Sequence, residues 1–360
     1  MQWMLIILLA PYLVLMLKMF SVLKRIKVFQ PVKISGIFVS VVVACRNEEL
    51  NLPGLLSDIA GQTYDNDCFE LIIADDNSTD LTFKIASEFK GIRNLKVLKS
   101  NGSGKKRALK TAIGASKGSV IITTDADCRV GKQWISAIVS YYSGQKPHMI
   151  IGPVIPECAA GFTGRFCELE FLGLQAVTAA TAAAGSPVMC NGANLAFTKD
   201  VYYRHCDNIH FDLNTGDDIF LLHSLKAEKD SRIAWLESPE AAVKSKLPDR
   251  IIPFLDQRAR WISKAGHYKD SQTIMLAIVI LTATILLAGL FISAIIYISV
   301  LPVLLAAFAI KSIPDYLLLS NTSTRYGMKK AMRWFLPSLI LYPFYVLAVI
   351  FSLPAGTARH

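Results

Sequence analysis

Residues 37–49 read IFVSVVVACRNEE, an unbroken apolar run that leads directly into a cluster of charged side chains. An uninterrupted apolar run, rather than an alternating one, is typical of a strand buried on both faces of a parallel sheet. Strand-like and helical stretches then alternate along the chain, which predicts a parallel α/β sheet with right-handed crossovers. Further strands are predicted at 71–74, 95–98, 120–124 and 148–155, and helices at 50–61, 81–90, 103–116 and 131–142.

Polar clusters follow three of the predicted strands, at the point where each strand ends. They are Arg46-Asn47-Glu48-Glu49, Asp75-Asp76 and Asp125-Ala126-Asp127. In an open α/β sheet, the carboxyl ends of the strands line the ligand crevice. One such cluster alone is explained as well by a solvated turn, because Asp and Asn are common turn residues. Three clusters at the same edge predict a binding site instead.

Asp125 and Asp127 are spaced i, i+2 after the strand predicted at 120–124. This spacing places both carboxylates on one side of the strand end. Two carboxylates this close repel each other unless a cation neutralises them. Mg²⁺ and Mn²⁺ suit such oxygen ligands and complete their coordination with water and substrate phosphates. The sequence therefore predicts a site for Mg²⁺ or Mn²⁺ at Asp125 and Asp127.

Thr215-Gly216-Asp217-Asp218 precedes an apolar helical start, and two interpretations of it are open. In the first, Thr215 caps the helix and the acids stabilise its first turn. In the second, one of the two carboxylates is a general base that faces the crevice.

Apolar segments at both ends of the chain predict a membrane protein, since 52% of the residues are hydrophobic and only 18% are charged. Residues 3–23 predict a retained N-terminal anchor rather than a cleaved signal peptide. Residues 273–310 carry no charge and predict two spans that turn near 289–294, and 334–353 predict a third span. The loop 311–333 between the last two is basic.

The net charge of +10 comes from basic residues beside these apolar ends, whereas the middle of the chain is balanced. This distribution argues against a nucleic-acid partner and fits the positive-inside rule, with the middle region and the loop 311–333 in the cytoplasm. Residues 248–270 mix apolar and charged residues and are predicted to lie in the membrane interface. The expected division is a membrane anchor at 1–24, an α/β domain at 34–247, an interfacial helix at 248–271 and three transmembrane helices at 272–354.

Five motifs follow one another between residues 38 and 270: R-N-E-E (46–49), D-D-N-S-T-D (75–80), D-x-D (125–127), T-G-D-D (215–218) and Q-R-A-R-W (257–261). In this order they resemble the membrane-embedded family-2 glycosyltransferases, which include cellulose, chitin-oligosaccharide, hyaluronan and poly-N-acetylglucosamine synthases and ceramide glucosyltransferases. The resemblance implies a GT-A fold, Rossmann-like and mostly parallel, on the cytoplasmic face of the plasma membrane. It also implies inverting transfer from a nucleotide sugar, usually UDP-linked.

The resemblance assigns a role to each matching residue. Asp218 is implied as the catalytic base, with Asp217 beside it, and the metal ion is implied at Asp125 and Asp127. The residues implied to bind the donor are Arg46, Glu48, Asp75, Asp76, Lys105, Lys106, Asp125, Arg258 and Arg260. Those implied to bind the acceptor are Asn191, Gly192, Gln257 and Trp261. Lys110 stands where the family commonly has Asn.

Two enzymatic functions agree with these motifs. The first is a synthase of the cell envelope, processive or oligosaccharide-forming, that extends a membrane-associated glycan. The second is transfer of one sugar to a membrane lipid, as in the ceramide glucosyltransferases. A transporter or scaffold with a degenerate domain is disfavoured, because such a domain should have lost carboxylates and every acidic motif here is complete.

Overall fold

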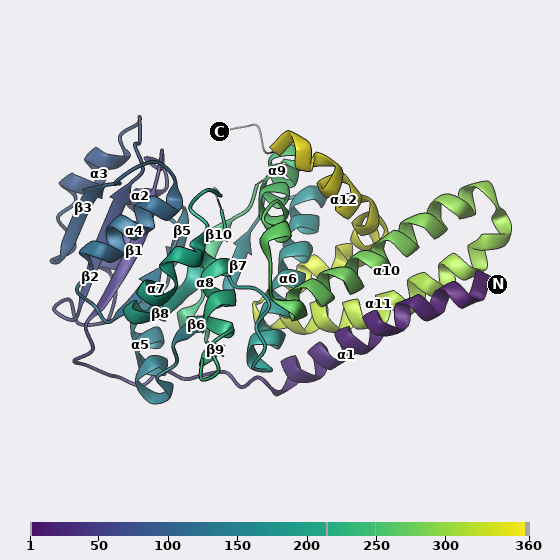
Figure 1. Ribbon diagram of the computed structural model, residues 1–360, viewed down its shortest axis with the longest axis horizontal. Helices are drawn as coiled ribbons and strands as arrows, with labels where there is room; N and C mark the ends of the chain where they lie inside the picture. The colour runs from purple at the N-terminus through teal and green to yellow at the C-terminus, as the bar shows by residue number, and fades with distance from the viewer. Residues whose placement is uncertain (1, 214, 249, 357–360) are drawn as a thin grey trace. The chain divides into compact units, whose positions relative to one another are not determined.

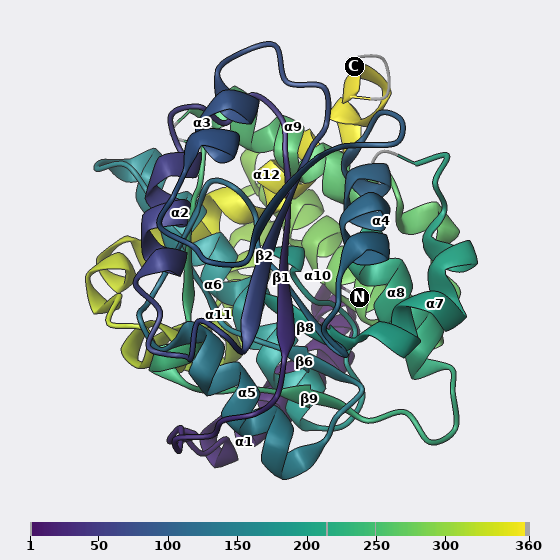
Figure 2. The ribbon, with the colours of Figure 1, turned by 90° about the vertical axis from the view of Figure 1, so that its left-hand side faces the viewer.

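The apolar run at residues 37–44 forms strand β1 (Val39–Cys45), in which every residue except Ala44 is buried. In the computed structural model, β1 lies between β2 (Phe69–Asp75) and β4 (Val120–Thr123) and is parallel to both. Figure 2 shows β1 and β2 side by side. The sheet has seven strands in the order β3-β2-β1-β4-β8-β6-β9. The remaining strands are β3 (Leu95–Lys99), β8 (Leu195–Thr198), β6 (Met149–Ile151) and β9 (Ile233–Trp235).

The predicted helices between these strands are present. They are α2 (Leu52–Ala60), α3 (Thr82–Glu88), α4 (Lys105–Ala115) and α5 (Trp134–Gln145), and they are joined later in the chain by α7 (Lys199–His205) and α8 (Asp217–Lys226). The structure describes residues 2–356 except 214 and 249. It therefore confirms the α/β, mostly parallel sheet.

Strands β8 and β9 of the sheet were not predicted, and one predicted strand is wrong. Strand β8 runs antiparallel to its neighbours β4 and β6 within the mostly parallel sheet. Residues 148–155 form two strands in different sheets, because β6 ends at Ile151 and β7 (Val154–Glu157) pairs with β10 (Val243–Lys246), which in turn pairs with β5 (Cys128–Val130). Pro153 between them has no N–H to continue a ladder, and Gly152 packs so closely on Asn194 that a Cβ would lie 2.4 Å from its Nδ2.

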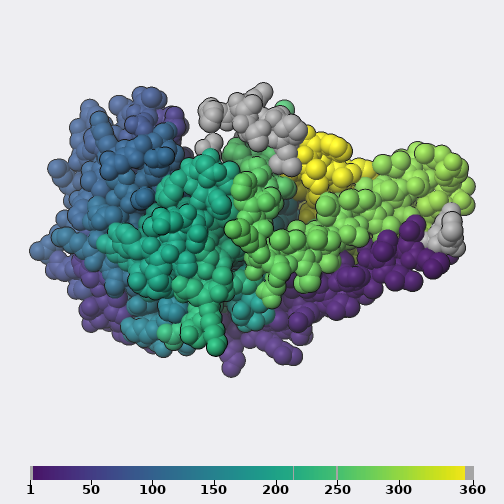
Figure 3. Space-filling model, viewed as in Figure 1, coloured from purple at the N-terminus to yellow at the C-terminus, as the bar shows by residue number. Residues whose placement is uncertain are grey.

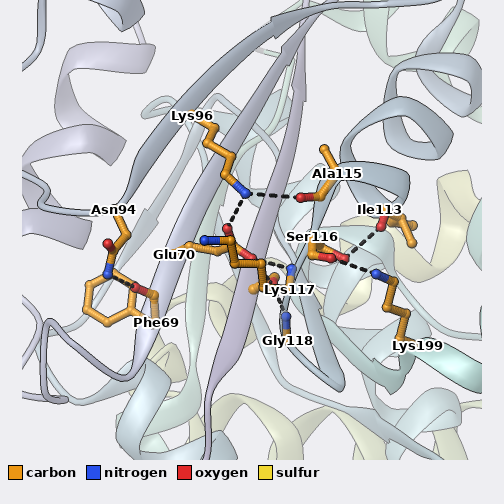
Figure 4. Close-up of polar contacts among 11 residues, drawn as sticks. Phe69, Glu70, Asn94, Lys96, Ile113, Ala115, Ser116, Lys117, Gly118 and Lys199 are labelled. Atoms are coloured by element: carbon orange, nitrogen blue, oxygen red, sulfur yellow. Dashed lines mark hydrogen bonds and ion pairs between the residues drawn. The ribbon is translucent and has the colours of Figure 1, made fainter.

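Glu70 in β2 is a buried carboxylate near the amino-terminal ends of β1, β2 and β3, and its hydrogen bonds connect these strands (Figure 4). One of its oxygens accepts hydrogen bonds from Ser40 Oγ (2.7 Å) and the Lys117 N–H (2.5 Å), and the other accepts from Lys96 Nζ (2.8 Å). Burial by itself raises the pKa of Glu70, but these bonds outweigh it and hold the pKa below its ordinary value. Glu70 therefore stays ionised and links β1, β2, β3 and the segment that precedes β4.

We expect Glu70→Gln to lower the free energy of unfolding by about 2 kcal/mol, because an amide leaves Lys96 without its carboxylate. Since the native pKa of Glu70 is depressed, its stabilising effect is complete above the unfolded pKa of about 4.3 and is lost as the pH falls through the native value. Thermal unfolding of the purified protein at neutral and acidic pH measures both effects. Glu88→Gln, at an exposed position of α3, is the matched control. Equal melting temperatures of the two variants would contradict this role of Glu70.

The remaining long helices are apolar, and four segments are long and apolar enough to cross a membrane: Trp3–Arg25, Ser271–Ile296, Ile298–Arg325 and Lys329–Ser352. They contain α1 (Ala10–Arg25), α10 (Ser271–Ile296), α11 (Leu301–Arg325) and α12 (Phe335–Gly356). Helices α1, α10 and α11 lie along one another in Figures 1 and 3. One N-terminal and three C-terminal apolar helices agree with the prediction.

The predicted turns between the spans are shifted. Helix α10 continues past 289–294 and ends at Ile296, and residues 311–325 of the predicted loop are the second half of α11. The charge at Lys311 indicated a loop, but in α11 its Nζ lies 2.5 Å from Asp315 Oδ2, one helical turn away. The Tyr12 hydroxyl of α1 also donates to Asp315 (2.5 Å). Because the two charges neutralise each other, the helix continues through them.

The chain divides into two compact units. The sheet unit comprises Lys27–Glu157 and Met189–Lys246, and the helical unit comprises Met1–Ile26, Cys158–Val188 and Leu247–His360. Helix α6 (Phe162–Ala183), which lies inside the predicted 34–247 domain, therefore belongs to the helical unit. The predicted interfacial segment forms α9 (Ile251–Ile262), in the same unit.

Candidate active site

The clusters after β1 and β2 are joined into one rigid edge, as the parallel pairing of these strands requires. Asn47 Oδ1 accepts from the Thr79 N–H (2.8 Å), and the Glu49 N–H donates to Asp80 Oδ2 (3.1 Å). Asn47 has a φ of 56°, in the left-handed region that Asn tolerates better than most residues. The prediction that these polar clusters share one sheet edge is therefore confirmed by the strand order β2-β1-β4.

Asp75 and Asp76 at the end of β2 have different surroundings. Asp76 Oδ1 accepts from the Gly104 N–H (2.8 Å), and its Oδ2 lies 4.0 Å from the guanidinium of Arg46. Asp75 Oδ2 accepts from the Ser78 N–H (3.2 Å), whereas Asp75 Oδ1 is buried and has no hydrogen-bond partner among the described residues. A buried acceptor without a donor is unfavourable. Asp75 Oδ1 is thus the atom in this cluster that could accept a hydrogen bond from an N–H group of a ligand.

Asp125 follows β4 and is bound by a lysine from α4. Lys105 Nζ lies 2.5 Å from Asp125 Oδ1. Loss of solvent around the ammonium lowers its pKa, but the charges of Asp125, Asp217 and Asp218 outweigh this effect and raise the pKa well above its usual value. The pKa of Lys105 therefore depends on carboxylates from two distant parts of the sequence, and Asp125 is the one in direct contact.

Asp127 completes the predicted metal pair. Ligand atoms of Asp125, Asp127 and Cys128 lie within 4.8 Å of one another. Burial, and after it the charges of Asp125 and Glu48, raises the pKa of Asp127 to about 6, although Lys105 acts in the opposite direction. Burial also raises the pKa of the Cys128 thiol, which keeps it protonated and unsuited to a hard cation. The two carboxylates fit Mg²⁺ or Mn²⁺. In this structure the positive charge beside them is the ammonium of Lys105, which is paired with Asp125.

The Asp217-Asp218 pair opens α8, and Gly216 (φ 95°) rather than Thr215 is the N-cap residue, without a side-chain capping bond. Asp218 Oδ2 accepts from the Gly192 N–H (3.0 Å), and its Oδ1 accepts from the Ile219 N–H (2.7 Å). The N-cap position therefore falls at Gly216, one residue after the predicted Thr215, and Asp218 is held in place by backbone donors.

The segment around Gly192 reaches this edge because β8 is antiparallel to β4. Leu195, the first residue of β8, lies opposite Thr123, the last of β4. Thr123 Oγ1 then donates to the Gly192 carbonyl (2.8 Å), and Asn191 Oδ1 accepts from the Ala193 N–H (3.0 Å). A Cβ on Gly192 would lie 3.7 Å from Asp217 Oδ2. The structure thus brings together the predicted residues of T-G-D-D and of the segment 190–194.

Lys106, next to Lys105, has a separate set of contacts. It is buried and donates to the carbonyls of Ile209 (2.8 Å) and His210 (2.7 Å). Its Nζ also lies 5.2 Å from the ring centre of Phe220 in α8. These contacts tie the start of α4 to the segment that leads into α8.

The Q-R-A-R-W motif lies on α9 in the helical unit and contains a buried ion pair. Arg258 donates through Nε (3.0 Å) and NH2 (2.5 Å) to the two oxygens of Glu170 in α6. The guanidinium carbon lies 4.1 Å from the ring centre of Trp261. Burial lowers the pKa of Arg258, but Glu170 outweighs this effect and raises it. Gln257 accepts from Arg258 (2.5 Å), and Arg260 is exposed.

The sequence motifs did not indicate Glu170. It lies in α6 two residues after Glu168, in the mostly apolar stretch 166–177, and an acid in such a stretch is seldom buried without a partner. These two acids were the signal for a buried cationic partner, but the sequence does not say which of the many basic residues it is.

Two family profiles match the chain. Residues 40–196 match "Glycosyl transferase family 2", and residues 120–353 match "Glycosyl transferase family group 2". The second match covers more than half of the chain and includes three of the four apolar segments. The chain therefore belongs to glycosyltransferase family 2.

Individual relatives match over shorter stretches. The chain is 33% identical over 119 residues to the glycosyltransferase AglE of Haloferax volcanii, which covers 32% of this chain and 39% of the relative. It is 34% identical over 113 residues to the β-monoglucosyldiacylglycerol synthase of a Nostoc species. That aligned stretch covers 30% of this chain and 24% of the relative. The matched stretch is thus less than half of either relative.

A solved structure matches along the whole chain. The mannosyltransferase PcManGT from Pyrobaculum calidifontis, in complex with GDP-Man and Mn²⁺, superposes with a TM-score of 0.62 at 19% identity over 98% of this chain and 99% of that one. This similarity shows the GT-A-like fold with its apolar helices.

Proposed function

We propose that the chain moves a sugar from a nucleoside diphosphate sugar, UDP-linked, to a hydroxyl group of a membrane-associated acceptor, with inversion at the anomeric carbon. The observation that carries this proposal is the acidic cluster of Asp125 and Asp127 after β4, with the Lys105 ammonium 2.5 Å from Asp125 Oδ1. Paired carboxylates at the carboxyl ends of parallel strands suit a donor whose diphosphate arrives with a divalent cation.

Each residue has a role in a single displacement. Asp75 Oδ1 accepts from an N–H of the base, and Arg46, Glu48 and Asp76 frame that pocket. A divalent ion held by Asp125 and Asp127 would supply positive charge for the diphosphate as it leaves. Asp218, oriented by the Gly192 N–H, removes the proton of the acceptor hydroxyl. The acceptor oxygen then bonds to the anomeric carbon while the bond to the phosphate oxygen breaks.

We extend the proposal to three further parts of the chain. Lys105 neutralises the diphosphate, and Lys106 positions the start of α8 beside it. Asn191 shapes the acceptor side together with Gly192. For α9 the proposal rests on its motif alone, which assigns Arg258 and Arg260 to the donor and Gln257 and Trp261 to the acceptor. Glu170 fixes the guanidinium plane of Arg258.

We further propose that the four apolar segments span the plasma membrane with the sheet unit in the cytoplasm, which the basic residues beside these segments support. The acceptor is then either a growing cell-envelope glycan or a membrane lipid that receives a single sugar. The similarity to a β-monoglucosyldiacylglycerol synthase favours the second candidate.

One assay tests this proposal. The detergent-purified protein is incubated with single UDP-sugars or GDP-mannose, Mg²⁺ or Mn²⁺, and a membrane lipid extract, and nucleotide release and products are measured. A ladder of products supports a synthase, and one sugar on a lipid supports the second candidate. Failure of every donor to release nucleotide above the no-enzyme background refutes the proposal.

Asp75→Asn should raise the KM for the donor about 10- to 100-fold with little change in kcat, because a charged hydrogen bond to the base is replaced by a weaker one. Steady-state kinetics with the best donor measure this change. Asp230→Asn, at an exposed position of the sheet unit, is the control. A KM equal to that of the control would remove Asp75 from the donor site.

A further inference from the structure

The helical unit contains a pocket of about 140 Å³, and none of its lining residues belongs to the acidic cluster. Its lining residues come from α1, α6, α10, α11 and α12, and most of its wall is apolar. The apolar side chains include Met16, Leu174, Leu318, Leu319, Phe335 and Leu339. An apolar cavity of about 150 Å³ holds a group the size of benzene. This pocket therefore has room for a segment of hydrocarbon chain.

The charged groups in the wall are already neutralised. Lys311 and Asp315 form an ion pair (2.5 Å), and Asp315 also accepts from Tyr12. Glu170 is bound by Arg258 (2.5 Å) and accepts from the Tyr345 hydroxyl (3.0 Å). An ionic ligand would have to separate one of these buried pairs, which is strongly unfavourable.

One polar group in the wall lacks a partner. Ser338 of α12 is 7% exposed, and its Oγ has no hydrogen-bond partner among the described residues. A buried hydroxyl in this state is stabilised by a neutral hydroxyl or ester oxygen, with which it can exchange a hydrogen bond. The wall thus combines space for a chain, neutralised charges and a single unsatisfied hydroxyl.

We propose that this pocket binds one hydrocarbon chain of an uncharged membrane lipid of the diacylglycerol type, with a hydroxyl or ester oxygen of that lipid at Ser338. Two observations favour a membrane lipid over a soluble apolar molecule. The pocket lies among helices that are apolar enough to cross a bilayer, where lipid chains are the surrounding solvent. The pocket is also large enough for part of a hydrocarbon chain but not for a whole lipid molecule. This inference goes beyond the transfer reaction and does not depend on the proposed function.

Photolabelling of the full chain in vesicles tests the proposal. The probe is a diacylglycerol with a diazirine in one acyl chain, compared with a phosphatidic acid that carries the same labelled chain. We expect the diacylglycerol to label the pocket segments of α6, α11 and α12 at least five-fold more strongly than the phosphatidic acid does. Equal labelling by the anionic probe, or no label in these segments, would overturn the proposal, and neither result depends on transferase activity.

Two variants localise the site. A Cβ on Gly173 would lie 3.8 Å from Leu319 Cδ2, so Gly173→Leu places its side chain in the pocket. We expect it to reduce labelling at least five-fold, whereas Gly289→Leu, whose Cβ meets nothing within 4 Å, leaves labelling unchanged. Ser338→Ala should reduce diacylglycerol labelling about five-fold through the lost hydrogen bond. If Gly173→Leu does not fold, the wild-type label map and Ser338→Ala decide, and undiminished labelling in Ser338→Ala contradicts the polar contact.

Discussion

Replacement of Asp218 by asparagine lowers kcat about a thousand-fold and leaves the Kd of the donor nearly unchanged, because an amide cannot take the proton of the acceptor hydroxyl. General-base catalysis contributes about 10²- to 10⁴-fold. An asparagine at this position retains an oxygen that can accept from the Gly192 N–H, so the local structure is preserved. Product formation under saturating substrates and calorimetric binding of the donor separate these two effects.

Asp217→Asn is the matched control, since Asp217 and Asp218 share the first turn of α8. We expect a smaller loss of kcat for Asp217→Asn than for Asp218→Asn. Near-wild-type transfer by Asp218→Asn would show that the base is another residue, and a larger loss in Asp217→Asn would assign the base to Asp217.

Asp127→Ala should abolish metal-dependent turnover, with kcat/KM reduced by about a thousand-fold. Removal of one carboxylate leaves the diphosphate without the positive charge that stabilises its departure, and single electrostatic contacts of this kind contribute about 10²- to 10³-fold. The same change should raise the Mn²⁺ concentration for half-maximal activity at least ten-fold. Titration of activity against Mn²⁺ measures both quantities.

The comparison variant is Glu88→Gln, an exposed acid of the sheet unit outside the acidic cluster, which should titrate like the wild type. Unaltered Mn²⁺ dependence in Asp127→Ala would place the metal elsewhere.

The part of the site that the sequence predicts depends on β1, β2 and β4. Their residues are almost all apolar, which predicts adjacent buried parallel strands, and parallel neighbours must end at the same edge. Asp75 and Asp125 are placed by this rule alone. The rule for parallel neighbours does not apply to strand β8, because its antiparallel direction depends on pairing with β4 and β6. The family resemblance assigned Gly192 and Asp218 separate roles, but the hydrogen bond between them was not predicted.

Side-chain partners are the least predictable feature. For the ion pairs Lys105–Asp125 and Arg258–Glu170, the sequence offers many alternative partners for each residue. The extent of α11 was missed for a different reason. A charge at 311 predicts a loop when it is considered alone, whereas pairing with Asp315 allows the helix to continue to Arg325.

Electron paramagnetic resonance of Mn²⁺ tests the central claim, that carboxylates at the sheet edge hold a divalent ion together with a nucleoside diphosphate. The wild-type protein with UDP should convert the signal of free Mn²⁺ into that of a protein-bound ion. The double variant Asp125→Ala/Asp127→Ala should give the same signal as Mn²⁺ and UDP without protein. Bound Mn²⁺ of undiminished amplitude in the double variant would contradict the account.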